Sequence, residues 1–266
     1  GIVPTLWRPI PAVGTFDMTP EVLDVTPFVG RLVDGGSHDV ALTVANIGDT
    51  WNLAANLLLY TDHHAATTSG ALTGDTIAPA AVQHTTEQPG TNQVTATVTA
   101  GRDWSTSGYV NTSAGRVRTT VTQHAAFRNA DTITSGGFAQ QLTESDSGFT
   151  TVHSDGPRGD SDSTHYWSYP ITINAAYQIT DDQNFNLSAT VDMARRLADS
   201  VNGRPVRQST DEVSSYGLDQ RSNGVTVAAD GHSWENYAGN DDTGGWYEHY
   251  IASAHGYVTV DRVHRF

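Results

Sequence analysis

Apolar and polar residues alternate at every second position over much of this chain. Val94, Ala96 and Val98 are separated by threonines, and Val191 and Met193 flank an aspartate. A period of two places successive side chains on opposite faces of a β-strand. The same spacing recurs in Val40, Leu42 and Val44; Val117, Thr119 and Val121; Ile171, Ile173 and Ala175; Phe185, Leu187 and Ala189; and the residues from Tyr257 to Val263. We therefore predict a chain built of strands, one of them at 38–46.

Three segments depart from simple alternation. The run from Leu53 to Tyr60 is nearly continuously apolar, which is typical of a strand buried on both faces. The segment 194–201 fits a helix or a strand, and we favour a strand. Near the start of the chain, Thr26 and Pro27 suit the N-cap and first position of a short helical turn, which we expect to end near Gly30.

Glycine-rich turn signals separate these runs. They are Asp34-Gly35-Gly36, Pro89-Gly90, Gly136-Gly137, Asp155-Gly156-Pro157, Asn202-Gly203, Asn223-Gly224, Asp230-Gly231 and Gly244-Gly245. Many strands divided by such turns indicate an antiparallel β-sandwich or jelly roll. We expect an all-β fold with little helix, built either as one unit or as two packed β units.

The chain divides into three regions on this interpretation. Residues 1–66 begin a jelly-roll domain, residues 67–91 form a loop or linker rich in Thr, Ala, Gly and Pro, and residues 92–266 add further antiparallel β-sandwich strands. Residues 155–163 carry several aspartates but lack the signature of a calcium loop. We therefore interpret them as a solvated hairpin loop.

The net charge limits the classes of partner that the chain can bind, and it says less about the fold. The formal net charge is −15, every basic residue is an arginine, and cysteine is absent. Such a surface repels nucleic acid and anionic membranes, although a compositional bias of the source genome would give the same profile. Without cysteine there is no disulfide or thiolate site, and no apolar run is long enough for a transmembrane helix. We expect no cofactor and no metal. Because the chain begins with Gly1 and not Met, we also expect a processed end.

Aromatic residues with polar neighbours are the first indication of a ligand. Aromatic rings stack on the apolar faces of sugars, while carboxylates, amides and arginines bond the hydroxyls. The residues of this kind are Trp7, Trp51, Tyr60, Trp104, Tyr166, Trp167, Tyr169, Trp234, Tyr237, Trp246, Tyr247 and Tyr250. About half of such a set would belong to the core or to domain contacts instead, as we expect at least of Trp167 and Tyr247.

Carboxylates supply the candidate acid and base. A hydrolytic site needs one group to activate water and another to protonate the leaving atom. Asp17, Asp62, Glu235 and Glu248 are the candidates, and both glutamates have aromatic neighbours. Arg8 would lower the pKa of Asp17 if the two pair, or it would stabilise an oxyanion; the alternative is an ion pair that only locks the segment. His63 and His64 would point to opposite sides of a strand, which disfavours a shared metal.

The beginning of the chain carries a more specific pattern. Its residues are Gly1-Ile2, Pro4, Trp7-Arg8-Pro9, Gly14, Phe16-Asp17, Asp24 to Gly30, Leu32 to Gly35, His38, Trp51, Ala55-Asn56-Leu57 and Asp62. In order and spacing this segment resembles the peptide N-glycanase A family, the glycoasparagine amidases. Residues 115–148 are similar to the same family in type.

The resemblance implies hydrolysis of the amide that joins an Asn side chain to the first N-acetylglucosamine of an N-glycan, on a metal-free β-sandwich or jelly roll. Combined with the candidates above, it gives catalytic roles to Asp17, Asp62 and Arg8, and substrate binding to Trp7, Trp51, Asn56, His63, Trp246 and Glu248. Members of that family are longer, with another β region in their N-terminal half. We therefore expect a secreted chain that acts on a glycopeptide together with a second polypeptide from the N-terminal half of the same precursor. The alternative is a carbohydrate-binding or structural β-sandwich module without catalysis.

Overall fold

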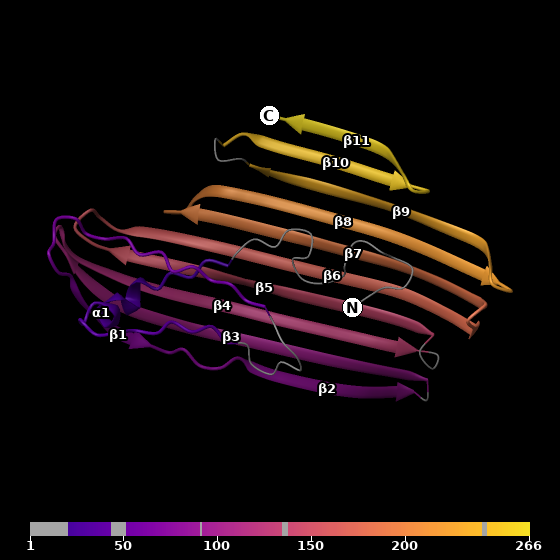
Figure 1. Cartoon of the computed structure of the whole chain (residues 1–266), viewed down its shortest axis with the longest axis horizontal. Coiled ribbons are helices and arrows are strands. Elements are labelled where there is room, and N and C mark those ends of the chain that lie inside the picture. Colours follow the sequence, from indigo (N-terminus) through magenta and orange to yellow (C-terminus); the bar gives the residue numbers. More distant parts are fainter. Residues whose placement is uncertain (1–20, 44–51, 91, 135–137, 241–243) are drawn as a thin grey trace.

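The computed structural model describes residues 21–43, 52–90, 92–134, 138–240 and 244–266. In this part of the chain eleven strands form one antiparallel sheet (Figure 1). Two short helical segments, η1 (Thr26–Phe28) and α1 (Val29–Leu32), precede the sheet. The strands are β1 (Ser69–Asp75), β2 (Ala81–Gly90), β3 (Gln93–Thr112), β4 (Gly115–Thr134), β5 (Ala139–Asp155), β6 (Ser161–Asp181), β7 (Asn184–Val201), β8 (Arg204–Ser222), β9 (Val225–Asn240), β10 (Trp246–Ala254) and β11 (Tyr257–Arg265).

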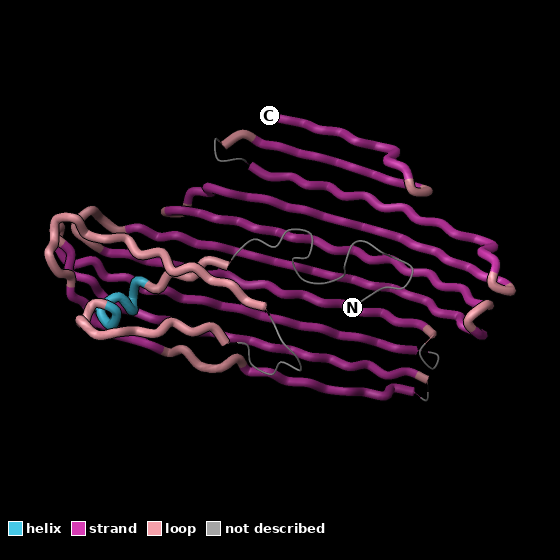
Figure 2. The backbone as a smooth tube through the Cα atoms, in the orientation of Figure 1, coloured by secondary structure: helices cyan, strands magenta, loops and turns pink. Residues whose placement is uncertain are grey.

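The strands follow one another across the sheet in chain order. From β3 onward each strand pairs with the next, and β1 and β2 both pair with β3 (Figure 2). Tight turns produce this order. Asn202 and Gly203 have φ values of 51° and 72°, and Asn223 and Gly224 have 51° and 75°. Positive φ at both central residues is required by the two-residue hairpin turn whose twist matches that of the flanking strands.

The fold class predicted from alternation is confirmed. The chain is all-β and antiparallel with little helix, and residues 194–201 lie in β7, as expected. The hairpin loop predicted at 155–163 is present but shorter, because β5 ends at Asp155 and β6 begins at Ser161. Alternation alone does not show how strands are shared between layers; here the described strands join a single sheet.

Three local predictions are wrong where the structure describes them. The range 67–91, expected as a loop or linker, contains β1 and β2, which pair with β3 through their backbones although they are poor in large apolar side chains. Residues 38–43 and 52–62 lie outside strands, and the leucines of the run 53–60 are exposed, up to 76% at Leu58. An apolar run becomes a buried strand only where neighbouring strands pair with it, and the edge beyond β3 is occupied by β1 and β2 instead.

The short helical turn is present at the predicted place, but its capping differs. Thr26 is the first residue of η1, and its side chain makes no cap. The carboxylate of Asp24 instead accepts the backbone N–H of Thr26 at 2.8 Å. The helix continues beyond Gly30 to Leu32.

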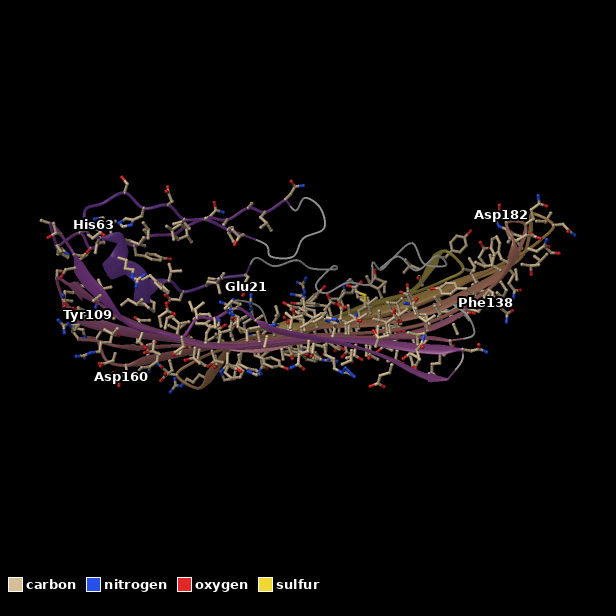
Figure 3. The ribbon with its side chains drawn as sticks, turned by 90° about the horizontal axis from the view of Figure 1, so that it is seen from below. Glu21, His63, Tyr109, Phe138, Asp160 and Asp182 are labelled. Atoms are coloured by element: carbon tan, nitrogen blue, oxygen red, sulfur yellow. The ribbon has the colours of Figure 1, made fainter. Side chains whose placement is uncertain are left out.

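The sheet has two unlike faces. On the inner face, which η1 contacts near Gly108, lies a core cluster of Ile171, Ile173 and Ala175 on β6 and Ala189, Val191 and Met193 on β7. Val191 is fully buried. Figure 3 shows the sheet from its edge, with Glu21 and His63 on the same side of it. We call the opposite side the outer face; it carries the alternate residues of each strand.

Candidate active site on the outer face of β8 to β11

A hollow of about 610 Å³ lies on the outer face over the last four strands. It is lined by Glu212, Trp234, Asn236, Glu248, Tyr250, Arg262 and His264. All seven residues have even numbers because they alternate with the inner-face residues of their strands. Residues from four strands therefore meet around one space.

Strand register determines which of these side chains are neighbours. One cross-strand row consists of Glu212, Asn236, Tyr250 and Arg262, each directly opposite the next. In the adjacent row Glu248 is directly opposite His264. Directly opposite residues in an antiparallel pair share a face, with Cβ atoms about 4.5–5.5 Å apart. The hollow thus places acidic, amide, aromatic and basic groups within reach of one ligand.

Two aromatic rings form a platform in the hollow. The Trp234 and Tyr250 ring centroids are 6.4 Å apart, and their planes are inclined by 24°. Trp234 remains 36% exposed. An exposed, stacked aromatic pair of this kind suits the apolar face of a sugar ring.

The two carboxylates of the hollow have different surroundings. Glu212 forms an ion pair with Arg196 of β7 at 2.6 Å, which holds its side chain in place. Glu248 has no hydrogen bond or ion pair with any residue that the structure describes. From the strand spacing and the rise per residue, the backbones of the two glutamates are about 12 Å apart, which leaves room for a ligand and a water between their side chains.

Two of the predicted site residues belong to this part of the molecule. Trp246 and Glu248 lie two residues apart on β10 and so share the outer face, and Glu248 lines the hollow. Trp7, Arg8, Asp17 and Trp51 lie outside the described residues. Asn56, Asp62 and His63 lie in the segment before β1. The contacts of Asp62 place it at the β3–β4 turn, and strands β5 to β7 lie between that turn and the hollow.

Asp62 is held by a network of hydrogen bonds. Its carboxylate accepts the backbone N–H of Ser113 at 2.6 Å, the hydroxyl of Ser113 at 2.8 Å and the backbone N–H of His64 at 3.0 Å. These bonds, the backbone bond from Ser113 first, lower the pKa of Asp62 below its usual value of 3.8. This carboxylate fastens the segment before β1 to the β3–β4 turn, and its catalytic role stays a prediction.

The other residues that line the hollow have no site role predicted from the sequence. Trp234 and Tyr250 were recognisable as aromatics with polar neighbours, but Glu212, Asn236, Arg262 and His264 carried no local signal. They come from different strands, and only the pairing register brings them to the same place.

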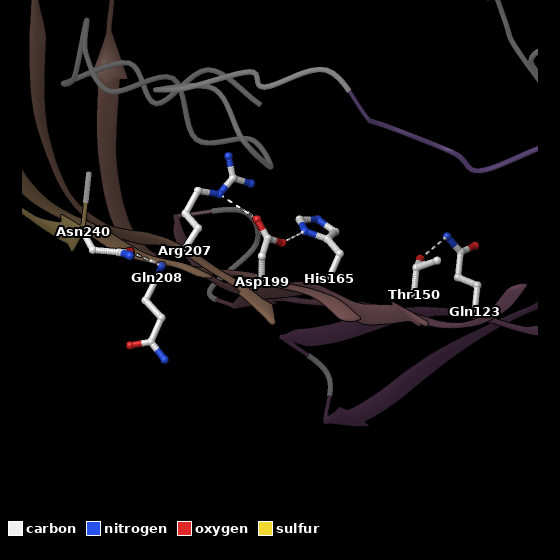
Figure 4. Close-up of polar contacts among 7 residues, drawn as sticks. All are labelled: Gln123, Thr150, His165, Asp199, Arg207, Gln208 and Asn240. Atoms are coloured by element: carbon white, nitrogen blue, oxygen red, sulfur yellow. Dashed lines mark hydrogen bonds and ion pairs between the residues drawn. The ribbon is translucent and has the colours of Figure 1, made fainter. Parts of the chain in front are cut away.

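A second polar arrangement crosses the inner face (Figure 4). The indole N–H of Trp104 donates to Gln123 at 2.9 Å, whose amide donates to Thr150 at 3.1 Å. Two strands further on, the carboxylate of Asp199 lies 2.5 Å from His165 Nδ1 and 2.8 Å from Arg207 Nε. Trp167, an expected core aromatic, is half-buried on this face. Because these polar groups mainly satisfy one another, we interpret the row as a structural link between strands and not as the site.

The structure offers no metal centre in the residues it describes. His249 and His255, six residues apart, would share a face of a single strand, but His249 pairs with Asp261 at 2.8 Å and His255 with Asp230 at 3.0 Å, so they do not converge. In the described ranges no group of three or more His, Cys, Asp or Glu side chains is arranged to hold a metal ion. Among the same residues no helix has the length and apolar character needed to span a membrane.

Comparisons with known proteins match two parts of the chain. Residues 1–77 match the family model of peptide N-acetyl-beta-D-glucosaminyl asparaginase amidase A, and residues 95–171 match the model of the PNGase A C-terminal domain. The peptide-N4-(N-acetyl-beta-glucosaminyl)asparagine amidase A of Prunus dulcis is 33% identical over 144 residues, which is 54% of this chain. The match spans 25% of that relative's length. No solved structure matches the chain.

The three matches agree with one another and with the motif at the start of the chain. The two family models cover separate stretches, and they occur in the order expected of the family. The chain therefore belongs to the peptide N-glycanase A family.

Proposed function

We propose that this chain takes part in hydrolysing the amide bond between an Asn side chain and the N-acetylglucosamine of an N-glycan. The observation that carries the proposal is the position of Glu248, a carboxylate without a partner among the described residues, in a hollow beside a stacked aromatic pair. Family membership supports the reaction class, and the name of the Prunus dulcis relative supports the linkage.

The side chains of the hollow suit the two requirements of amide hydrolysis. Glu248 takes a proton from water as the water oxygen bonds to the amide carbon, and the guanidinium of Arg262 stabilises the negative charge on the carbonyl oxygen. The carbon–nitrogen bond then breaks, and the proton on Glu248 passes to the departing nitrogen. The products are an aspartate side chain and a glycosylamine, so all atoms of the consumed water are accounted for.

The neighbouring groups would hold the glycan in place during this step. Trp234 and Tyr250 present rings to the first sugar, and Asn236 offers an amide to its hydroxyl or acetamido groups. Glu212, held by Arg196, is a second acceptor for sugar hydroxyls. His264, opposite Glu248, is a further donor for the leaving group.

We propose further that a second polypeptide completes the enzyme. The match spans a quarter of the relative's length, and a chain from the N-terminal half of the same precursor would supply part of the remainder. The predicted roles of Trp7, Arg8, Asp17 and Trp51 belong to this proposal, as does secretion of the mature protein. Intact mass spectrometry of natively purified protein should find a second chain besides the 28.5 kDa species; a single species that converts glycopeptide alone would refute this part.

The test of the proposed reaction compares two isosteric variants. A denatured N-glycopeptide is incubated with the natively purified protein, and the peptide is analysed for conversion of Asn to Asp, a mass change of about one unit. Glu248→Gln should lower kcat by at least about 100-fold, the usual contribution of a general base. Glu235→Gln is the matched control, because Glu235 lies on β9 with its side chain on the inner face. Equal activity of Glu248→Gln and the native protein would refute the role of Glu248.

A carbohydrate-binding module without catalysis is the second candidate function. The aromatic pair in an open hollow favours it, because such a surface binds sugar even without a catalytic carboxylate. Retained glycopeptide binding without conversion of Asn, in a preparation that contains any second chain, would identify this alternative.

A further inference from the structure

A second hollow of about 490 Å³ lies over the middle strands of the sheet. A cross-strand row runs through it, formed by Thr132, Gln141, Asn174, Thr190 and Tyr216. Each residue is directly opposite the next, so all five side chains share the outer face and follow one another at the strand spacing of about 4.8 Å. The row thus forms a ladder of hydroxyl, amide and aromatic groups across β4 to β8.

The chemistry of this hollow is neutral throughout. None of its lining residues is charged, on a chain whose formal net charge is −15. The amides of Gln141 and Asn174 make no hydrogen bond with another side chain in the described ranges, so their donors and acceptors are open to a ligand. Tyr216 stacks on His232, with ring centroids 4.9 Å apart, which fixes the tyrosine ring at one end of the ladder. Paired donors and acceptors beside an aromatic ring suit a ligand with many neutral hydroxyls.

The two hollows are close enough to hold one molecule. Tyr216 of the second hollow and Glu212 of the first lie four residues apart on β8 and on the same face. At the rise of an antiparallel strand this separation is about 13 Å. An oligosaccharide whose first sugar lies over Trp234 can therefore extend its outer sugars across β8 and onto the amide ladder.

We propose that the second hollow is a binding subsite for the neutral outer sugars of the glycan. The inference rests on the proposed function, because it takes the first hollow as the place of the glycan–asparagine linkage. The subsite selects oligosaccharides of neutral sugars over glycans that end in acidic sugars. The acidic sugars would meet amides without a cationic partner, on a negatively charged chain.

Binding of free oligosaccharide tests the subsite separately from catalysis. Calorimetric titration of the natively purified protein with a neutral oligomannose N-glycan, released from its peptide, should show tighter binding than free N-acetylglucosamine. Asn174→Asp and Gln141→Glu should each weaken oligomannose binding by about tenfold or more, because each adds a charge without changing shape. Gln83→Glu on the edge strand β2 is the matched control, and it should bind as the native protein does.

Measurements on the unaltered protein keep the test independent of variant folding. Saturation-transfer NMR should show contact with several sugars of the oligomannose chain, and a sialylated N-glycan should bind more weakly. Oligomannose binding that is no tighter than that of N-acetylglucosamine, or that is unchanged in folded Asn174→Asp, would overturn the proposal. Loss of binding in Asn174→Asp with no glycopeptide conversion by the native protein would overturn the amidase function and leave the subsite standing. Conversion that depends on Glu248, with unchanged oligomannose binding in Asn174→Asp, would overturn the subsite and leave the amidase function standing.

Discussion

Substitution of Gly108 by alanine should detach the N-terminal helical turn from the sheet. A Cβ atom at this position of β3 would lie 2.2 Å from the carbonyl oxygen of Pro27, and 2.8 Å from its carbonyl carbon and Cα. Ordinary contacts of a Cβ atom begin near 3.4 Å, so the backbone of η1 must move by more than 1 Å. Overpacking of this kind costs about 1–3 kcal/mol.

The matched control is Gly74→Ala on β1. There the nearest atom to a new Cβ is Cβ of Ser107 at 3.8 Å, an ordinary contact. The control should change the free energy of unfolding by less than about 1 kcal/mol, and in the stabilising direction if the strand geometry is kept.

Two measurements check this prediction. Urea denaturation should show a lower midpoint for Gly108→Ala, and trypsin should cut more rapidly after Arg31, the exposed arginine of α1, once η1 no longer packs on β3. A variant with the midpoint of the native protein and an unchanged rate of cleavage at Arg31 would refute the packing of η1 against Gly108.

Three further predictions concern ionisation and the core. Asp62→Asn should lower the free energy of unfolding at neutral pH, and the difference from the native protein should shrink as pH falls. The pKa of Asp62 is lowered in the folded state, so its carboxylate stabilises the fold fully above the unfolded pKa of 3.8. That stabilisation is lost as pH falls through the folded pKa. A stability difference independent of pH would contradict it. Asp162 raises the pKa of His153, so this histidine stabilises the fold fully below pH 6.5, and that stabilisation is lost as pH rises through the folded pKa. His153→Gln should remove this contribution to the free energy of unfolding. Parallel profiles of stability against pH for the variant and the native protein would count against this. Val191→Ala should cost about 2 kcal/mol in urea denaturation because the side chain is fully buried, whereas Val225→Ala, at a site 64% exposed, should cost little; equal costs would be inconsistent with the core assignment.

The local sequence pattern predicted strand faces and turns correctly where a single short-range property of the residues determines them. Alternation placed Ile171, Ile173 and Ala175 on one face, and that face proved to be the buried one. Asn202-Gly203 and Asn223-Gly224 marked turns because Asn and Gly accept the positive φ that a two-residue hairpin needs. The same reasoning failed for 53–60, since burial of an apolar run depends on partners that the run itself does not specify.

In the candidate site, too, some residues could be identified from the sequence and others only from the pairing of the strands. Glu248 could be singled out because it is one of few glutamates and has aromatic neighbours, and Trp246 because it is an aromatic residue among polar ones. Glu212 lies far from Glu248 along the chain, and no property of its own segment connects the two. The register of β8, β9 and β10 brings them to one hollow.

The sequence alone thus determined the strand content, most turns, the family and one carboxylate of the hollow, because these follow from short-range periodicity and motif spacing. The tertiary structure decided that the described strands form a single sheet, which residues share each face, and which side chains meet. The physical reason is that strand pairing depends on contacts between residues far apart in the sequence. A shift of the register by one residue would move every side chain of a strand to the other face, and the residues of the hollow would no longer meet.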